Sequence, residues 1–171
     1  MSRNEAFEKA PSLERQSQHC FYSRVFSSRI RLGVRTGLIA AAATGGAIVG
    51  FGARHNDWSG PFATLGYQVM QGMGVADAPR LIPTAAGLAA HTSWMVLWGI
   101  AFAALSYRKT PAVTVLFALL VGLGASFLAR SMVPAALGAV KFASMPSVQA
   151  ALCVALMIAG LLAGQALSRA E

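Results

Sequence analysis

His91 is the residue of this sequence that offers the most chemistry. It lies within the charge-free stretch Leu81–Tyr107, about 15 Å of helical rise from the start of that stretch, and so near the middle of a bilayer that the stretch would cross. An ionisable side chain at that depth is costly and is therefore a candidate for function. Four interpretations are open: a hydrogen bond across a helix bundle to Thr44, Ser126 or a backbone carbonyl, a proton relay, a contact to a substrate, and an axial ligand of haem or a chlorophyll-type pigment. We favour the first.

The pigment interpretation depends on one neighbour. Gly87 lies one helical turn before His91 and would leave room for a flat macrocycle. However, haem b sites usually use two histidines on facing helices, and the other apolar stretches contain no histidine. The two cysteines, Cys20 and Cys153, are too far apart in sequence to form a metal-binding motif. We therefore expect no cofactor and no metal.

Arg130 is the second candidate. It follows the apolar stretch Thr110–Ala129, about one turn from the end of the helix we expect there, so that its long side chain can reach the headgroups. The alternative is a contact to an anion or a substrate, together with His91. No paired carboxylates lie in the apolar stretches, and no phosphate loop, serine nucleophile motif or zinc-protease motif occurs. We therefore assign no catalytic residue and expect a protein that is not an enzyme.

The elements that must position these residues are four charge-free apolar stretches of at least 18 residues, each long enough for a helix to cross a bilayer. They are Thr36–Ala53, Leu81–Tyr107, Thr110–Ala129 and Phe142–Ser168. Hydrophobic residues make up 56% and charged residues 12% of the chain, against about 45–50% and 25% in soluble domains. The sequence thus predicts an all-α integral membrane protein, a bundle of four transmembrane helices at about 32–53, 81–106, 111–133 and 147–168. Residues 31–169 would form a single domain.

The connections add two expectations. The link Ser106–Pro111 is so short that the second and third spanning helices must form an antiparallel hairpin. In the loop Arg54–Arg80, apolar residues recur at near-helical spacing between Gly60-Pro61 and Gly72–Gly74. We expect a short interfacial helix here, an ordinary connector in preference to a cap over a site between the spanning helices.

The charge distribution indicates the orientation. Seven of the fourteen basic residues precede the first apolar stretch, most of them in a tail, residues 1–30, that we expect to be partly disordered. Because Lys and Arg concentrate on the cytoplasmic side, both termini are predicted to be cytoplasmic, in a bacterial inner (plasma) membrane. The net charge of +8 then favours anionic lipid headgroups at the tail as partners, and not nucleic acid. Gly50–Ala53 weakly resembles a signal-peptide cleavage site, but we favour an uncleaved first helix.

Rows of small residues predict how the helices associate. Such rows let helix backbones approach closely in a bilayer. The first helix carries one row at Gly33, Gly37, Ala41 and Gly45 and a second at Ala42, Gly46 and Gly50. These faces suit packing within the bundle, a second copy or a partner in a membrane complex. The function we expect is a non-enzymatic accessory or assembly component of a membrane complex. The alternative is a small oligomeric transporter or channel with His91 and Arg130 near its path.

Overall fold

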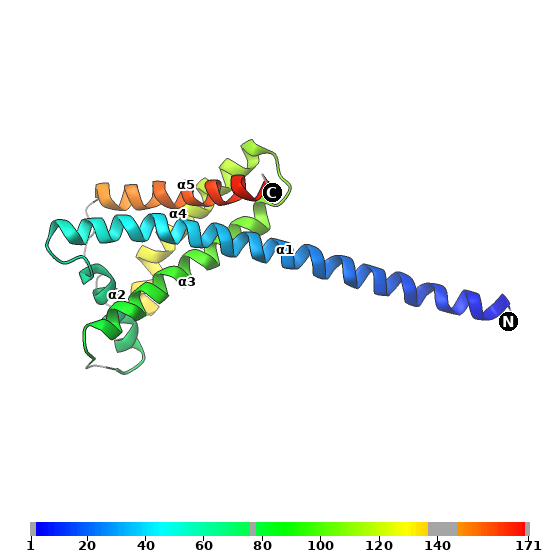
Figure 1. Cartoon of the computed structure of the whole chain (residues 1–171), viewed down its shortest axis with the longest axis horizontal. Helices are drawn as coiled ribbons and strands as arrows, with labels where there is room; N and C mark the ends of the chain where they lie inside the picture. The colour runs from blue at the N-terminus through cyan, green and yellow to red at the C-terminus, as the bar shows by residue number, and fades with distance from the viewer. Residues whose placement is uncertain (1–2, 76–77, 137–146, 170–171) are drawn as a thin grey trace.

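The described part of the chain is helical and contains five helices. The computed structural model describes the backbone of residues 3–75, 78–136 and 147–169, and the side chains of residues 27–75, 78–129, 131 and 148–169. The helices are α1 (Arg3–Arg54), α2 (Gly60–Gly72), α3 (Leu81–Ser106), α4 (Pro111–Ala136) and α5 (Ser147–Arg169) (Figure 1). The predicted all-α class is confirmed.

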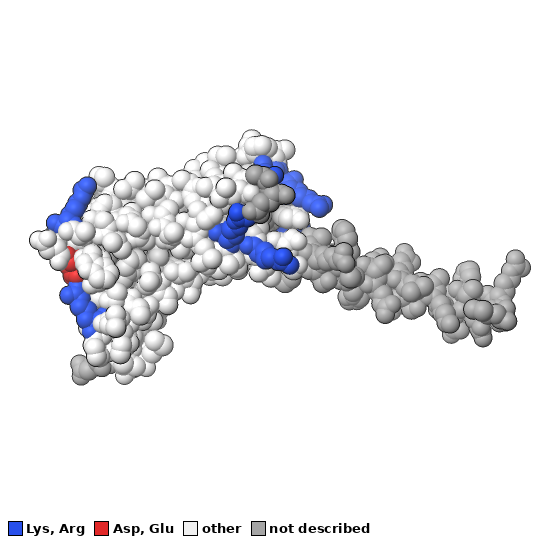
Figure 2. All heavy atoms as spheres, in the orientation of Figure 1, with Lys and Arg blue, Asp and Glu red and all other residues white. Residues whose placement is uncertain are grey.

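Four of these helices are long and apolar enough to cross a membrane. The spans are Ser27–Arg54, Leu81–Ser106, Pro111–Ala129 and Val148–Arg169. Lys and Arg side chains gather at the two ends of the bundle, separated by a wide band without charge (Figure 2). On α4, Leu123 and Phe127 are 58% and 70% exposed, whereas Ala118 and Ala125 are buried. Large apolar side chains outside and small ones inside are the arrangement expected of a multi-pass membrane protein.

The start of α1 differs from the expectation. The apolar pattern predicts a helix from about residue 32, whereas the helical backbone begins at Arg3 and carries α1 well past the other helices (Figure 1). Nine of the twelve residues 5–16 are Glu, Ala, Lys, Leu, Arg or Gln, which favour helix even without an apolar face to bury, although Pro11 among them does not. The hydropathy of the sequence therefore indicates where the membrane-spanning part of a helix starts, but it does not indicate where the helix itself starts. The division of the chain at residue 30 stays a prediction.

α1 packs against two of the other spanning helices. It packs antiparallel against both α3 and α5, and α4 packs against α3 and α5. The core between them contains Phe102 and Leu161, both fully buried, together with alanines and methionines from all four spanning helices. The link from α3 to α4 gives the predicted antiparallel hairpin.

Glycines set the spacing at the crossings of α1. A methyl group on Gly37 would lie 2.5 Å from the Cα atom of Val96 on α3, and one on Gly33 would lie equally close to Ile100. On the other side, a methyl group on Gly160 of α5 would lie 2.6 Å from the Cα atom of Ala40. These positions cannot take a side chain without separating the helices, which is the close packing predicted from the small-residue rows.

α2 is the helix predicted in the loop Arg54–Arg80, but its main contact is with another helix. It runs antiparallel along the start of α3, where Gly66 lies against the carbonyl of Pro83 and Gly87 against that of Phe62. Its buried residues are Phe62, Ala63, Gly66 and Met70. An antiparallel α2–α3 hairpin thus forms part of the bundle, and the interfacial position of α2 stays a prediction.

Candidate functional site

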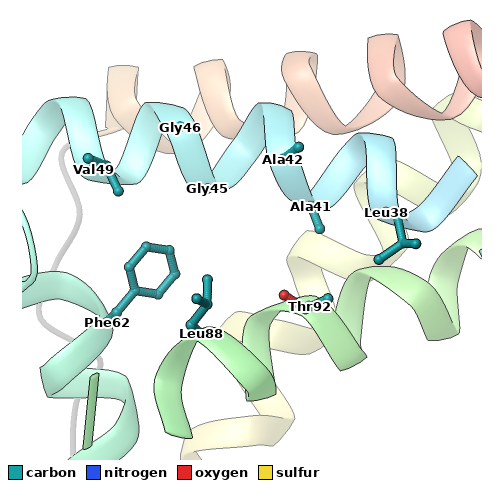
Figure 3. A pocket seen from close by; sticks show the side chains of 9 residues that line it. All are labelled: Leu38, Ala41, Ala42, Gly45, Gly46, Val49, Phe62, Leu88 and Thr92. Atoms are coloured by element: carbon teal, nitrogen blue, oxygen red, sulfur yellow. The ribbon is translucent and has the colours of Figure 1, made fainter. Parts of the chain in front are cut away.

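The candidate site lies where α1 and α3 separate. The two helices are closest at Gly37 and Gly99 and diverge toward the C-terminal end of α1, with α2 near the open end (Figure 1). His91 of α3 lies in this region, and the ring of Phe62 from α2 reaches into the space between the two helices (Figure 3). Three helices therefore contribute to the surroundings of His91.

The imidazole of His91 is hydrogen-bonded across the bundle. Its Nε2 lies 3.0 Å from the hydroxyl oxygen of Thr44 on α1. The same hydroxyl donates to the carbonyl of Ala40, 2.8 Å away, and the tautomer of the imidazole sets the direction of its bond with Nε2. Thr44 was one of the three kinds of partner predicted from the sequence, and this prediction is confirmed.

The rest of the imidazole is enclosed. The rings of Phe62 and His91 meet edge to face, with centroids 5.6 Å apart and an angle of 67° between their planes. A methyl group on Gly45 would lie 3.8 Å from Nε2, an ordinary van der Waals distance. His91 is only 9% exposed, so Thr44, Gly45 and Phe62 together shield it.

An open groove of about 340 Å³ lies in front of this site (Figure 3). Its wall is apolar except for the hydroxyl of Thr92. The lining residues are Leu38, Ala41, Ala42, Gly45, Gly46, Val49, Phe62, Leu88 and Thr92. His91 does not line the groove but lies behind Gly45 and Phe62. The groove therefore presents an apolar surface with a single polar side chain, which suits the packing of an apolar partner better than catalysis.

The room expected beside Gly87 for a flat macrocycle does not exist. The carbonyl of Phe62 and the backbone of Gly66 occupy it, because α2 packs directly on this part of α3. This corrects the basis of the pigment interpretation. Gly87 serves the contact between α2 and α3.

Arg130 lies in the helical backbone of α4, but its side chain is outside the described residues. Its proximity to His91 stays a prediction. At the end of the molecule where α1 stops, Arg80 forms an ion pair with Asp57, which joins the α1–α2 connection to the start of α3. Among the side chains that the structure describes, no group of three His, Cys, Asp or Glu residues could hold a metal ion.

Gln165 is a buried polar residue that the sequence reasoning missed. It lies on α5, is 4% exposed, and donates from Nε2 to the carbonyl of Ser106 at 3.3 Å. Its Oε1 atom is buried without a hydrogen-bond partner. An amide within the stretch Phe142–Ser168 was the available signal, since polar side chains in such a stretch usually face the bundle interior.

No family model, curated protein or solved structure matches this chain.

Proposed function

We propose that the chain is a non-enzymatic accessory or assembly component of a membrane complex, which holds a transmembrane helix of a partner protein against α1. The proposal places it in a bacterial inner membrane with both termini in the cytoplasm. The basic residues of the tail, the α3–α4 link and the end of α5 support this orientation, because Lys and Arg concentrate on the cytoplasmic side.

The observation that carries the proposal is an uncovered row of small residues. Ala42, Gly46 and Gly50 are exposed along one face of α1, and a methyl group on Gly46 or Gly50 would meet no atom of the described residues within 4 Å. Elsewhere on α1, Gly33 and Gly37 are covered by the backbone of α3. The uncovered row is thus of the kind that this same helix already uses to bind a neighbouring helix.

The site around His91 supports a structural role for the same region. The imidazole joins α1 to α3 through Thr44, and Phe62 of α2 packs on its ring. These contacts hold α1, α2 and α3 in the arrangement that forms the groove. A partner helix on Ala42 and Gly46 would meet a preformed surface, and binding would not require the helices to rearrange.

The test is the native mass of the protein extracted from its own membrane in a mild detergent. We expect wild type to migrate in a complex, and Gly46→Leu to release it because the new side chain fills the contact. Gly124→Leu is the matched control. A methyl group on Gly124 of α4 would also meet no atom within 4 Å in the part of the chain that the structure describes, but Gly124 does not line the groove.

Two results would contradict the proposal. One is a wild-type protein that migrates alone, and the other is a complex that survives Gly46→Leu as well as it survives Gly124→Leu. A complex made only of copies of this chain would replace the partner with a second copy and favour the oligomeric transporter or channel.

A further inference from the structure

Three segments that are far apart in the sequence converge at the end of the bundle where the spanning part of α1 begins. They are the start of that span at Arg29, the α3–α4 link at Tyr107–Lys109, and the end of α5 at Arg169. Lys and Arg side chains gather at this end of the molecule (Figure 2).

The ring of Tyr107 is the centre of this convergence. The Cζ atom of Arg29 lies 4.9 Å from the ring centroid, and the Cζ atom of Arg108 lies 5.4 Å from it. Both distances are in the range of cation–π contacts. Guanidinium groups from two different segments therefore lie against one aromatic ring. We call Arg29, Tyr107 and Arg108 the Tyr107 cluster.

The backbone of the link is fixed from two sides. Arg108 has a φ of 57°, in the left-handed region that few residues other than glycine adopt, so the surrounding structure must impose this conformation. Arg169 donates to the carbonyl of Lys109 at 3.1 Å and to the hydroxyl of Thr114 at 3.3 Å, which ties the link to α5. The backbone that carries Tyr107 and Arg108 is thus held in one conformation.

These charges have no acidic counterpart among the described side chains. The single carboxylate there is that of Asp57, which pairs with Arg80 at the opposite end of the bundle. Two like charges held on one ring repel each other, so an anion bound beside the ring is attracted by both guanidinium groups. Guanidinium groups bind phosphate oxygens through paired N–H donors.

We propose that the Tyr107 cluster binds the phosphate headgroup of an anionic phospholipid in the leaflet at this end of the bundle. We favour a lipid as the source of the phosphate because the cluster lies where the spanning parts of α1, α3 and α4 reach the membrane surface. Tyrosine is enriched at that depth, with its ring among the headgroups. The inference is independent of the proposed partner helix on α1, since the two surfaces do not share a residue.

The experiment is native mass spectrometry of the full-length protein in a neutral detergent, titrated with phosphatidylglycerol. Arg29→Gln removes one guanidinium, and Arg108→Asn removes the other with a residue that tolerates positive φ. A basic residue at an anionic surface contributes about 1 kcal/mol, so we expect each variant to bind about fivefold more weakly. Arg29→Lys and Arg108→Lys keep the charge and should retain most of the affinity.

Two matched control variants distinguish binding at a specific site from non-specific attraction by the net positive charge. Arg31→Gln removes an exposed arginine two residues from Arg29, and Arg54→Gln removes one at the opposite end of the spanning part of α1. Each lowers the net charge as much as Arg29→Gln does but should leave lipid binding unchanged. Circular dichroism of every variant checks that the helices are intact.

Three outcomes would overturn the proposal. Equal loss in Arg31→Gln and Arg29→Gln would show diffuse attraction and no site. Equal binding of phosphatidylcholine would show that the acyl chains, and not the anionic headgroup, are recognised. Displacement of phosphatidylglycerol by inorganic phosphate at a similar concentration would make a free anion the ligand.

Discussion

His91 illustrates how one polar residue in a membrane helix acquires its role from its neighbours. Its position in an apolar stretch marks it as a candidate for proton or substrate chemistry. The structure gives it a hydrogen bond to Thr44 and a ring contact to Phe62, both of which connect helices. His91 therefore connects α1, α2 and α3, and its contribution can be measured as a change in the free energy of unfolding.

The first prediction concerns the bond between Thr44 and His91. Thr44→Val keeps the shape of the side chain but removes the hydrogen-bond partner of Nε2. Because interhelical hydrogen bonds in membranes contribute about 0.6 kcal/mol on average, and at most about 1.7, we expect a loss of about that size. The measurement is reversible unfolding in mixed micelles.

Two further variants isolate the bond. Thr44→Ser keeps the hydroxyl and should lose less than Thr44→Val. In a His91→Phe background, Thr44→Val should cost nearly nothing, because the partner is already absent. Equal losses with and without His91 would show that the bond adds no stability.

At the scale of the elements, the glycines of α1 have different roles although they share one helix. Gly37 lies against the backbone of α3, whereas Gly45 faces the side chains of His91 and Phe62 at ordinary contact distance. A methyl group on Gly46 or Gly50 would have no atom of the described structure within 4 Å. The angle between α1 and α3 creates the difference between Gly37 and Gly45. The two helices are in backbone contact at Gly37 and have moved apart by Gly45, so only Gly37 lies against the backbone of α3.

This difference predicts that a Gly-to-Ala substitution destabilises the protein at one of these positions and not at the other. Gly37→Ala places a methyl group 2.5 Å from the Cα atom of Val96, so α1 and α3 must separate. We expect a loss of about 1–3 kcal/mol in the free energy of unfolding, the usual range for overpacking. Gly45→Ala should change it little, because the nearest atoms are 3.8 Å away. Unfolding in mixed micelles compares the two, and equal destabilisation would contradict the crossing geometry.

At the scale of the whole molecule, charge is divided between the two ends of the bundle (Figure 2). One end carries Arg29, Arg108, Lys109 and Arg169, and the other carries Arg54 together with the pair of Arg80 and Asp57. This asymmetry underlies the proposed orientation, because positive residues are retained on the cytoplasmic side.

The orientation predicts which positions a membrane-impermeant maleimide reaches in spheroplasts. In a Cys153→Ser background, Cys20 should be labelled only after the membrane is permeabilised. With Cys20→Ser added, a cysteine introduced by Ser59→Cys, between α1 and α2, should be labelled without permeabilisation. Labelling of Cys20 from outside, with Ser59→Cys protected, would reverse the orientation.

The sequence alone determined the number of spanning helices, most of their bounds, the α3–α4 hairpin and the existence of α2. Hydropathy, proline positions and link lengths are local properties, and in a bilayer every backbone polar group must be satisfied within its own helix. The start of α1 was not determined, because helix propensity continues through the polar tail to Arg3. Thr44 was identified only as one of several partners for His91.

Only the tertiary structure decided which small residues are covered and what occupies the space beside Gly87. The pattern of Gly33, Gly37 and Gly45 is uniform along the chain, whereas their surroundings depend on the angle at which α1 and α3 cross. The position of α2 depends in the same way on Gly66 and Gly87, two glycines that permit contact between the backbones of α2 and α3. Crossing angles arise from the fit of whole helix surfaces, and this information is not carried by any single stretch of sequence.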